Sequence, residues 1–245
     1  MFNCGDRVIG FCSSRPWCVK LLALVVSMQG MDEAHGLPHS VRVLCNALLI
    51  GEKEGADLDV VTATALLHDI GRSVERPGLH HAEVSAALAM LLRPLAPVLL
   101  EKAELITECI LRHSYSLGIE GDAPLECCVL RDADRLDALG ALGVYRTIAH
   151  GAVRGRNVED TLEHFHAKLS RLADTMCTET GRRLARERSE LLSSFFKALR
   201  EEYSVYRGAV EWATLKALEE LTPARGVAEK HGAEDTYSAH TRRSR

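Results

Sequence analysis

The sequence predicts an all-α fold built around one hydrophobic core. Its 245 residues, 47% hydrophobic and 26% charged, match the size and composition of a single globular domain. In nearly every segment the apolar residues recur at intervals of three and four, as they do along one face of a helix. The sequence has no β-branched runs between turn signals and no repeat of about 20 to 50 residues, which excludes parallel-sheet and solenoid folds.

The two ends of the chain differ in composition from the rest. Residues 1–18 contain two glycines and a proline and predict an irregular leader. Residues 222–245 are polar, with several arginines near the end. They contain too few large apolar groups to offset the entropy of ordering, so they predict a disordered tail. The folded domain is expected to occupy residues 19–221.

The first apolar stretch, Val19–Met28, has the length of the hydrophobic part of a targeting signal. It is too short to span a bilayer, which takes about 20 apolar residues. Asp6 is atypical of a mitochondrial transit peptide. The stretch therefore predicts a first core helix in a cytoplasmic protein that makes no membrane contact, with mitochondrial import as the alternative interpretation.

Capping residues and periodicity predict the helices that follow. Leu44 and Leu48 share one helical face, and Pro38 suits the first turn of that helix. Asp57 or Asp59 can cap the next helix, whose apolar residues continue to a His-Asp pair. The later helices are expected at about His81–Leu92, Val98–His113, Leu125–Ala149, Val158–Met176, Glu179–Tyr203 and Tyr206–Leu221.

The last of these helices is amphipathic, with apolar residues at Val210, Ala213, Leu215 and Leu218. This face is compatible with two arrangements. It can pack on a second subunit, giving a homodimer, or fold back onto its own domain.

The charge balance argues against nucleic acid as a partner. Lys and Arg number 30 against 34 for Asp and Glu, so the formal net charge is −4 and no global basic field exists. The sequence also lacks GxxxxGK[ST], which excludes the usual phosphate loop.

The eight cysteines show no CxxC pair and no zinc-finger spacing. Several lie in apolar helical patterns, where a thiol acts as a small hydrophobic group. The sequence thus predicts unpaired thiols in a reducing compartment. The adjacent Cys127 and Cys128 leave redox chemistry as an alternative.

The strongest local signal is His68-Asp69, at the end of an apolar helix. Imidazole and carboxylate are ligands that suit divalent first-row metals, and adjacent positions at a helix end can turn both groups toward one point. His39 lies one helix earlier and Asp134 much later in the chain.

This order of residues, H…HD…D, closely resembles the HD-domain superfamily of metal-dependent phosphohydrolases. Residues 132–146 look like the helix that carries the last aspartate in small stand-alone members of that superfamily. Residues 164–169 and 178–188 are similar to the closing helices of the same branch. The resemblance covers about Val19 to about Tyr203.

The resemblance implies an HD-domain helical bundle in which His39, His68, Asp69 and Asp134 hold a divalent cation. The branch is associated with nucleotide pyrophosphohydrolase activity. The ligand types suit Mn²⁺, Co²⁺, Fe²⁺ or Mg²⁺ in an open site, rather than a closed structural zinc site. Asp132 and Asp134 cannot both face one ion, because positions two apart on a helix diverge by about 200°. The resemblance implies Asp134 as the last ligand, since its Ala-Asp pairing matches the position of that ligand in the superfamily.

Other residues depart from the family pattern or extend it. The branch often has His-Asp where this chain has His35-Gly36, so one carboxylate is missing. His81 and His113 fall where two-metal HD enzymes place additional ligands. Three interpretations stay open for these two histidines: a second cation bridged by Asp69, a contact with a substrate phosphate, or no functional role.

The expected catalytic residues are His68, Asp69, Arg72 and Lys168. Arg72 and Lys168 are candidates to neutralise phosphate oxygens, although a structural ion pair or a solvated charge would explain either. His35 is a candidate to orient substrate or water.

These features favour a metal-dependent phosphohydrolase acting on a nucleotide-like phosphoester or phosphoanhydride by attack of metal-activated water. A nucleoside triphosphate pyrophosphohydrolase is the preferred form. The alternatives are a nucleotide-sensing module with little turnover and a nucleotide phosphomonoesterase. A helical scaffold with incidental histidines is disfavoured by the ordered spacing. The partner is therefore expected to be a small phosphorylated substrate.

Overall fold

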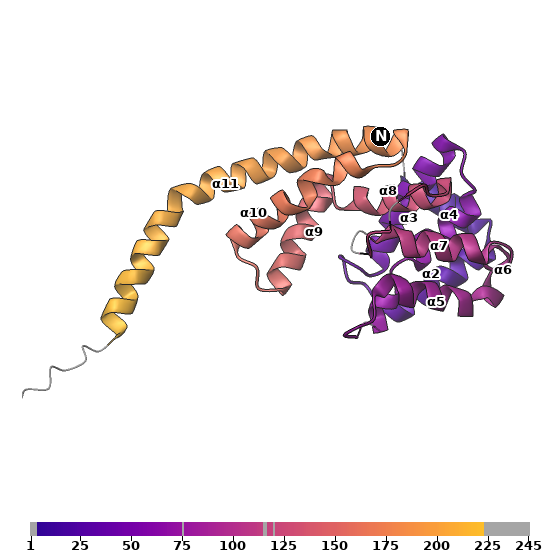
Figure 1. Cartoon of the computed structure of the whole chain (residues 1–245), viewed down its shortest axis with the longest axis horizontal. Helices are drawn as coiled ribbons and strands as arrows, with labels where there is room; N and C mark the ends of the chain where they lie inside the picture. The colour runs from indigo at the N-terminus through magenta and orange to yellow at the C-terminus, as the bar shows by residue number, and fades with distance from the viewer. Residues whose placement is uncertain (1–3, 75, 115–116, 120, 223–245) are drawn as a thin grey trace, which may run out of the picture. The chain divides into compact units, whose positions relative to one another are not determined.

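The computed structural model describes residues 4–74, 76–114, 117–119 and 121–222. All regular secondary structure in these ranges is helical, which confirms the all-α prediction (Figure 1). The α-helices are α1 Cys4–Ser13, α2 Pro16–Gln29, α3 Leu37–Glu54, α4 Leu58–Leu67, α5 His81–Leu91, α6 Pro97–Glu101, α7 Ala103–His113, α8 Leu125–Asp137, α9 Gly140–Val153, α10 Val158–Ala167 and α11 Glu179–Leu221. Short 3-10 helices are η1 Ile70–Val74, η2 Arg93–Leu95 and η4 Leu169–Thr175.

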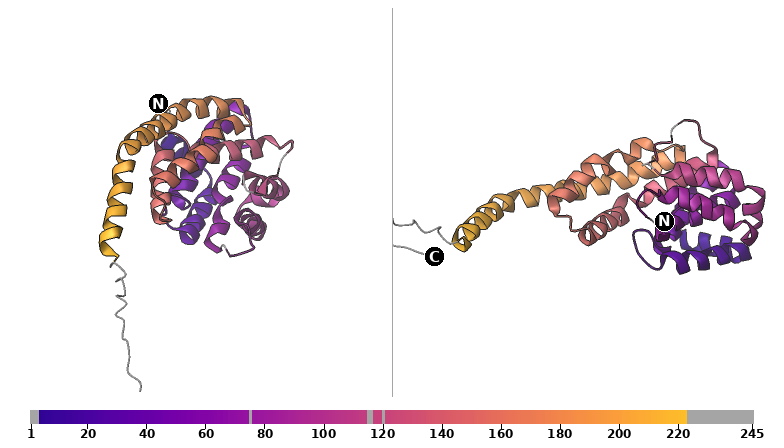
Figure 2. Two further views of the ribbon diagram at one scale, coloured as in Figure 1. Left: turned by 60° about the vertical axis from the view of Figure 1, so that its left-hand side comes forward. Right: turned by 60° about the horizontal axis from the view of Figure 1, so that its bottom comes forward.

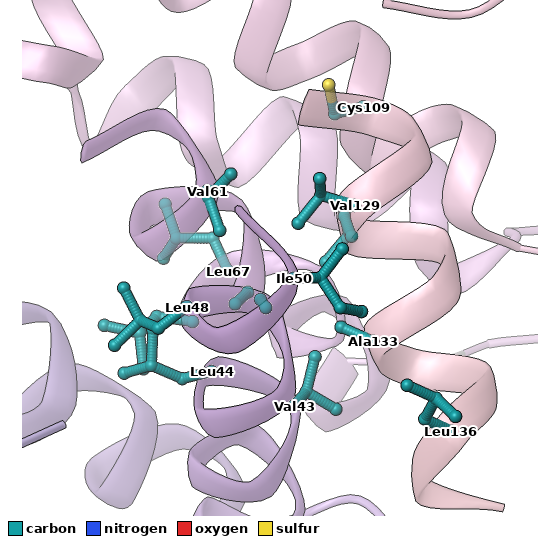
Figure 3. Packing of buried hydrophobic residues seen from close by; sticks show 14 of the residues in the cluster. Val43, Leu44, Leu48, Ile50, Val61, Leu67, Cys109, Val129, Ala133 and Leu136 are labelled. Atoms are coloured by element: carbon teal, nitrogen blue, oxygen red, sulfur yellow. The ribbon is translucent and has the colours of Figure 1, made fainter. Parts of the chain in front are cut away.

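Helices α3, α4, α7 and α8 form the centre of the bundle. Figures 1 and 2 show them packed together with helices from the first half of the chain. Figure 3 shows the contact between α3 and α8, where Val43 and Ile50 lie near Val129 and Ala133. All four side chains are fully buried. This packing matters for function because it fixes the facing ends of the helices that carry the His and Asp residues.

The caps of the central helices follow the sequence prediction. Pro38 lies in the first turn of α3, which ends at Gly55 in the left-handed conformation with φ 81°. Asp57 caps α4, because its carboxylate accepts hydrogen bonds from the backbone N–H groups of Asp59 and Val60. This cap sets where α4 begins, one helix length before His68.

Asp57→Ala is expected to lower the free energy of unfolding by about 1 kcal/mol, because two N–H groups at the start of α4 lose their acceptor. Urea denaturation followed by circular dichroism measures the change. Asp57→Asn is the matched control, because the amide oxygen can still accept. Equal losses in both variants would contradict the capping role.

The predicted irregular leader at residues 1–18 is wrong over its described part. Residues 4–13 form α1, and α2 already begins at Pro16. Val8 and Cys12 of α1 are buried, and α1 packs against α2 and α3. Gly5 and Gly10 led to the prediction of an irregular segment, but the segment is a helix whose apolar side chains pack into the core.

The prediction of unpaired buried thiols is wrong for Cys45, which is disulfide-bonded, and for four further cysteines. Cys12 is disulfide-bonded to Cys18, and Cys109 to Cys127. The first bond joins α1 to α2 and the second joins α7 to α8. The adjacent Cys127 and Cys128 are thus not paired with each other, and Cys128 is a free thiol.

Several predicted helices are divided differently in the structure. The helix expected at 98–113 is split at Lys102 into α6 and α7. The one expected at 125–149 is interrupted between Asp137 and Gly140, where α8 ends and α9 begins, and Gly140 has a φ of 72°. The one expected at 158–176 leaves the α-helical form after Ala167 and continues as η4.

The two helices expected at 179–203 and 206–221 are one continuous helix, α11. The compact unit that contains the core ends at Glu202, earlier than the predicted boundary at 221. Described residues of the second unit, 203–222, are the end of α11 and one following residue. The predicted disordered tail lies outside the described residues, apart from residue 222.

No single helix among the described residues is long and apolar enough to cross a membrane. Only the pair Gly5–Ser13 and Pro16–Gln29, bent by 117° at its break, passes that test when taken together. Val8, Cys18 and Leu21 of this pair are buried in the core.

Candidate metal centre

The ends of three helices bring four side chains to one point. His39 lies in the first turn of α3, His68 follows the last turn of α4 with Asp69 next to it, and Asp134 lies in α8. The Nε2 atoms of His39 and His68 are 3.2 Å apart. The Asp134 Oδ1 atom lies 3.5 Å from the first and 3.9 Å from the second. The Asp69 Oδ2 atom lies 3.8 Å from each of the two Nε2 atoms.

The His39 ring is held by a buried carboxylate behind it. Its Nδ1 atom lies 2.8 Å from Asp137 Oδ2, and both side chains are about 1% exposed. Arg42 and Arg146 also donate to Asp137, each at 2.7 Å. Burial opposes ionisation of Asp137, but these partners lower its pKa well below the usual range. The ionised carboxylate accepts a hydrogen bond from the Nδ1–H group of His39, and in this tautomer the Nε2 atom presents its lone pair to the centre.

The His68 ring is fixed in the same sense. Its Nδ1 atom donates to the Ala65 carbonyl oxygen at 2.8 Å. Complete burial lowers the pKa of His68 to about 4, so the ring is neutral at pH 7. Its Nε2 atom therefore also presents a lone pair. Two lone pairs 3.2 Å apart repel each other unless a cation lies between them, and these donors fit a divalent metal ion.

Asp69 faces two groups of side chains. Its Oδ2 atom is directed to the four-residue cluster, and its Oδ1 atom lies 3.5 Å from His81 Nε2 and 3.6 Å from His113 Nε2. Burial would raise the pKa of Asp69, but the neighbouring His68, His113 and Arg72 hold it well below the usual range. The buried Oδ1 atom has no hydrogen-bond partner among the described residues. A carboxylate with one oxygen in each group has the form of a bridging ligand.

Arg72 already occupies part of the space between Asp69 and His81. Its Nε atom donates to Asp69 Oδ2 at 2.6 Å, and its Nη2 atom lies 3.1 Å from His81 Nε2. Burial and this guanidinium lower the pKa of His81 to about 3. A second cation bound by His81 and His113 would have to displace Arg72. The three interpretations of these two histidines, a second cation, a phosphate contact or no functional role, stay predictions.

A cavity of about 250 Å³ opens from the cluster, and we call it the metal-centre cavity. Every residue assigned a functional role from the sequence lines it, except the completely buried His68. Its lining includes His35, Arg72, Arg135 and Lys168, and also Arg146, which sequence reasoning did not select. The lining of the cavity therefore combines the carboxylates of the cluster with several basic side chains around them.

The comparisons with known proteins agree with this geometry. The HD domain family model matches residues 36–139, a range that contains the whole cluster. The uncharacterized protein YpgQ of Bacillus subtilis is 35% identical over 184 residues, which cover 70% of this chain and 85% of the relative. This chain belongs to the HD domain family.

Solved structures extend the comparison. The crystal structure of B. subtilis YpgQ in complex with ADP has a TM-score of 0.64 at 31% identity, covering 76% of this chain and 95% of that chain. An HD-superfamily hydrolase from Bacillus thuringiensis has a TM-score of 0.58 at 28% identity, covering 76% of this chain and 96% of that chain. The fold is therefore that of an HD-superfamily hydrolase.

In this HD domain the two aspartates that competed for the last ligand position have separate surroundings. Asp134 faces His39 and His68, whereas the buried Asp132 accepts hydrogen bonds from the backbone N–H groups of Cys177 and Thr178, at 2.8 Å each. The Thr178 hydroxyl adds a third at 2.7 Å. Asp132 thus anchors the start of α11, and its oxygens are directed away from the cluster.

The missing carboxylate at Gly36 has a steric cause. A Cβ atom at this position would lie 2.5 Å from the backbone N and O atoms of Asp32, because the turn before α3 folds back on itself. No side chain fits there without moving the backbone. His35, beside it, reaches the cluster instead, with its Nδ1 atom 3.2 Å from Asp69 Oδ2.

Sequence reasoning did not assign functional roles to Arg42 and Arg146, which hold Asp137. One signal could have pointed to Arg42, because it follows His39 by three residues and so shares its helical face. Arg146 has no such signal, because it reaches the site from α9.

The metal-free protein is expected to lose stability as the pH falls from about 6.5 to about 4. His68 has its pKa lowered to about 4 in the folded state, so the unfolded chain binds more protons throughout this window. The loss from His68 is on the order of 3 kcal/mol. His81 acts in the same direction, whereas the raised pKa of His113 opposes them.

Urea denaturation between pH 4.5 and pH 7.5, in the presence of a chelator, measures this slope. His68→Gln should flatten it. The exposed His166, replaced by Gln, is the control and should leave the slope unchanged. A free energy of unfolding that does not vary over this range would contradict the assigned protonation of His68.

Proposed function

We propose that this protein is a divalent-metal-dependent phosphohydrolase that converts nucleoside triphosphates to nucleoside monophosphates and pyrophosphate. The carrying observation is the pair of Nε2 lone pairs of His39 and His68, 3.2 Å apart and flanked by the carboxylates of Asp69 and Asp134. This arrangement calls for a cation. The ADP complex of the similar YpgQ supports a nucleotide as the ligand class.

The four residues of the cluster would hold the metal ion, and Asp137 would orient His39 through its Nδ1 proton. When bound, a divalent ion supplies a Lewis acid that makes water acidic enough to act as a nucleophile near neutral pH. Arg72 and Lys168 line the same cavity and would neutralise the non-bridging phosphate oxygens. His35 lies at the cavity wall with its ring close to Asp69, where it can orient water or substrate.

The proposed reaction balances without a further reactant. Water attacks the α-phosphorus, the bond from that phosphorus to the α,β-bridging oxygen breaks, and pyrophosphate leaves with the electron pair. One oxygen from water remains on the monophosphate, and a proton is released to solvent or to a basic side chain. The proposal requires the cavity to accept the phosphate chain in line with the attacking water.

A hydrolysis panel tests this function. Purified full-length protein is incubated with Mn²⁺, Co²⁺, Fe²⁺ or Mg²⁺ and with ATP, ADP, AMP and the deoxynucleotide counterparts, and pyrophosphate and orthophosphate are quantified separately. The expected result is equimolar monophosphate and pyrophosphate from triphosphates. Orthophosphate released only from monophosphates would support the phosphomonoesterase instead. Tight nucleotide binding without turnover would support a sensing module.

A further inference from the structure

A second cavity, of about 300 Å³, adjoins the metal-centre cavity. The two share His35, Arg72, Ala138, Arg146 and Lys168 in their linings. The second cavity then continues between α9, α10 and the loop that joins them. We call it the basic cavity, and its own basic residues are His150, Arg154, Arg156 and His164.

Within the described ranges, the lining of the basic cavity is rich in positive charge, and of its arginines only Arg72 and Arg146 are paired with carboxylates, those of Asp69 and Asp137. Its lining, among the described residues, contains no carboxylate. None of the salt bridges found in the described part of the chain involves Arg154, Arg156 or Lys168. By contrast, the exposed Arg183 on α11 forms an ion pair with Glu187 of the same helix. The unpaired cations here leave hydrogen-bond donors available to a ligand.

The histidines of the basic cavity respond to this field. Burial, followed by the nearby Arg154, His35 and Arg156, lowers the pKa of His150 to about 4. Burial, Arg156 and Lys168 likewise lower the pKa of His164. Guanidinium and ammonium groups from α9, α10 and the loop between them therefore act on the same enclosed space. Such a cavity is complementary to a compact polyanion.

We propose that the basic cavity binds the pyrophosphate unit of the substrate, that is, the two phosphates that lie beyond the α-phosphate held at the metal centre. This assignment rests on the proposed function. The shared Arg72, Arg146 and Lys168 would span the junction between the α-phosphate and the pyrophosphate unit. Arg154 and Arg156 would determine how strongly the enzyme prefers triphosphates over shorter phosphate chains.

Calorimetric titrations of the metal-free full-length protein test this site without turnover. The probes are inorganic pyrophosphate, ATP and AMP, each in the presence of a chelator. The test variant is Arg154→Gln/Arg156→Gln. The matched control is Arg183→Gln/Arg186→Gln, which removes the same charge from exposed positions on α11 outside both cavities.

The test variant is expected to bind pyrophosphate and ATP at least about tenfold more weakly, which corresponds to about 1.4 kcal/mol. Its affinity for AMP should change less than about twofold, and the control should match the wild type. Pyrophosphate binding that weakens less than about threefold, or equally in the control, would overturn the proposal, as would the absence of pyrophosphate binding to the wild type.

Two further measurements keep the outcomes separate. Circular dichroism establishes that the variants fold, and the single variant Arg154→Gln, at an exposed position, replaces the double variant if it does not. It is judged by the same thresholds. If the wild-type protein binds pyrophosphate but releases none from triphosphates in the hydrolysis panel, the proposed function is refuted and the pyrophosphate site is retained. If the wild-type protein hydrolyses triphosphates but does not bind pyrophosphate, the pyrophosphate site is refuted and the proposed function is retained.

Discussion

Asp69→Asn is expected to reduce pyrophosphate release from ATP by at least about 1,000-fold, equivalent to about 4 kcal/mol of transition-state stabilisation. The amide has the shape of the carboxylate but carries no charge. Asp69 is the one side chain of the cluster that faces both the His39–His68 pair and the His81–His113 pair. Its loss therefore removes a proposed metal ligand and places an NH₂ donor where a cation should lie.

The measurements are steady-state turnover with Mn²⁺ and metal content after dialysis, on protein whose helicity is checked by circular dichroism. Asp122→Asn is the control, because Asp122 is exposed and lines neither cavity. It should retain wild-type turnover and metal content. If Asp69→Asn kept more than about a tenth of the activity with its metal bound, the assignment of Asp69 would be wrong.

The convergence of His39, His68, Asp69 and Asp134 shows how much of a site a sequence can indicate. Each of these residues lies on a core helix or directly at its end, so the packing of that helix into the core also determines where the polar residue points. The same reasoning located α3, α4 and α5 close to their observed bounds. Local periodicity placed these helices, whereas the choice of the four residues as one ligand set came from the resemblance to the HD-domain superfamily.

Other features depend on contacts that no local pattern carries. The irregular appearance of residues 1–18 came from glycines that a helix tolerates once Val8 and Cys12 are buried. The break before α9 places Gly140 at a φ of 72°, a conformation that side chains other than glycine's rarely adopt. Arg146 enters the site from a helix that starts only after that break. The basic cavity, built by the same region, was therefore not foreseeable.

Asp137→Ala is expected to be the most destabilising single substitution at the site, lowering the free energy of unfolding by about 3 kcal/mol. This buried carboxylate accepts hydrogen bonds from Arg42 and Arg146 and contacts His39. Removing it leaves the Arg146 guanidinium without its carboxylate partner and leaves Arg42 paired only with Glu33, and breaking a buried pair costs about 3–5 kcal/mol. The lower end applies because both arginines keep some solvent contact.

The same carboxylate should matter to catalysis as a positioning residue. Without it the Nδ1 proton of His39 has no acceptor, so the tautomer that presents Nε2 to the metal is no longer favoured, and metal affinity should fall by about 10- to 100-fold. Asp137→Asn separates the two effects, because its amide oxygen can still accept from one partner while the charge is lost. We expect it to weaken Mn²⁺ binding but to destabilise less than Asp137→Ala.

Urea denaturation and Mn²⁺ titration of both variants measure these effects. Asp59→Ala is the reference, because Asp59 pairs with Arg15 at the surface and its loss should cost at most about 1 kcal/mol. A cost for Asp137→Ala no larger than for Asp59→Ala would mean that the arginines are solvated rather than held by Asp137. Unchanged Mn²⁺ affinity would mean that His39 keeps its orientation without the carboxylate. Because the two readouts are independent, the structural and the positioning roles of Asp137 can be judged separately.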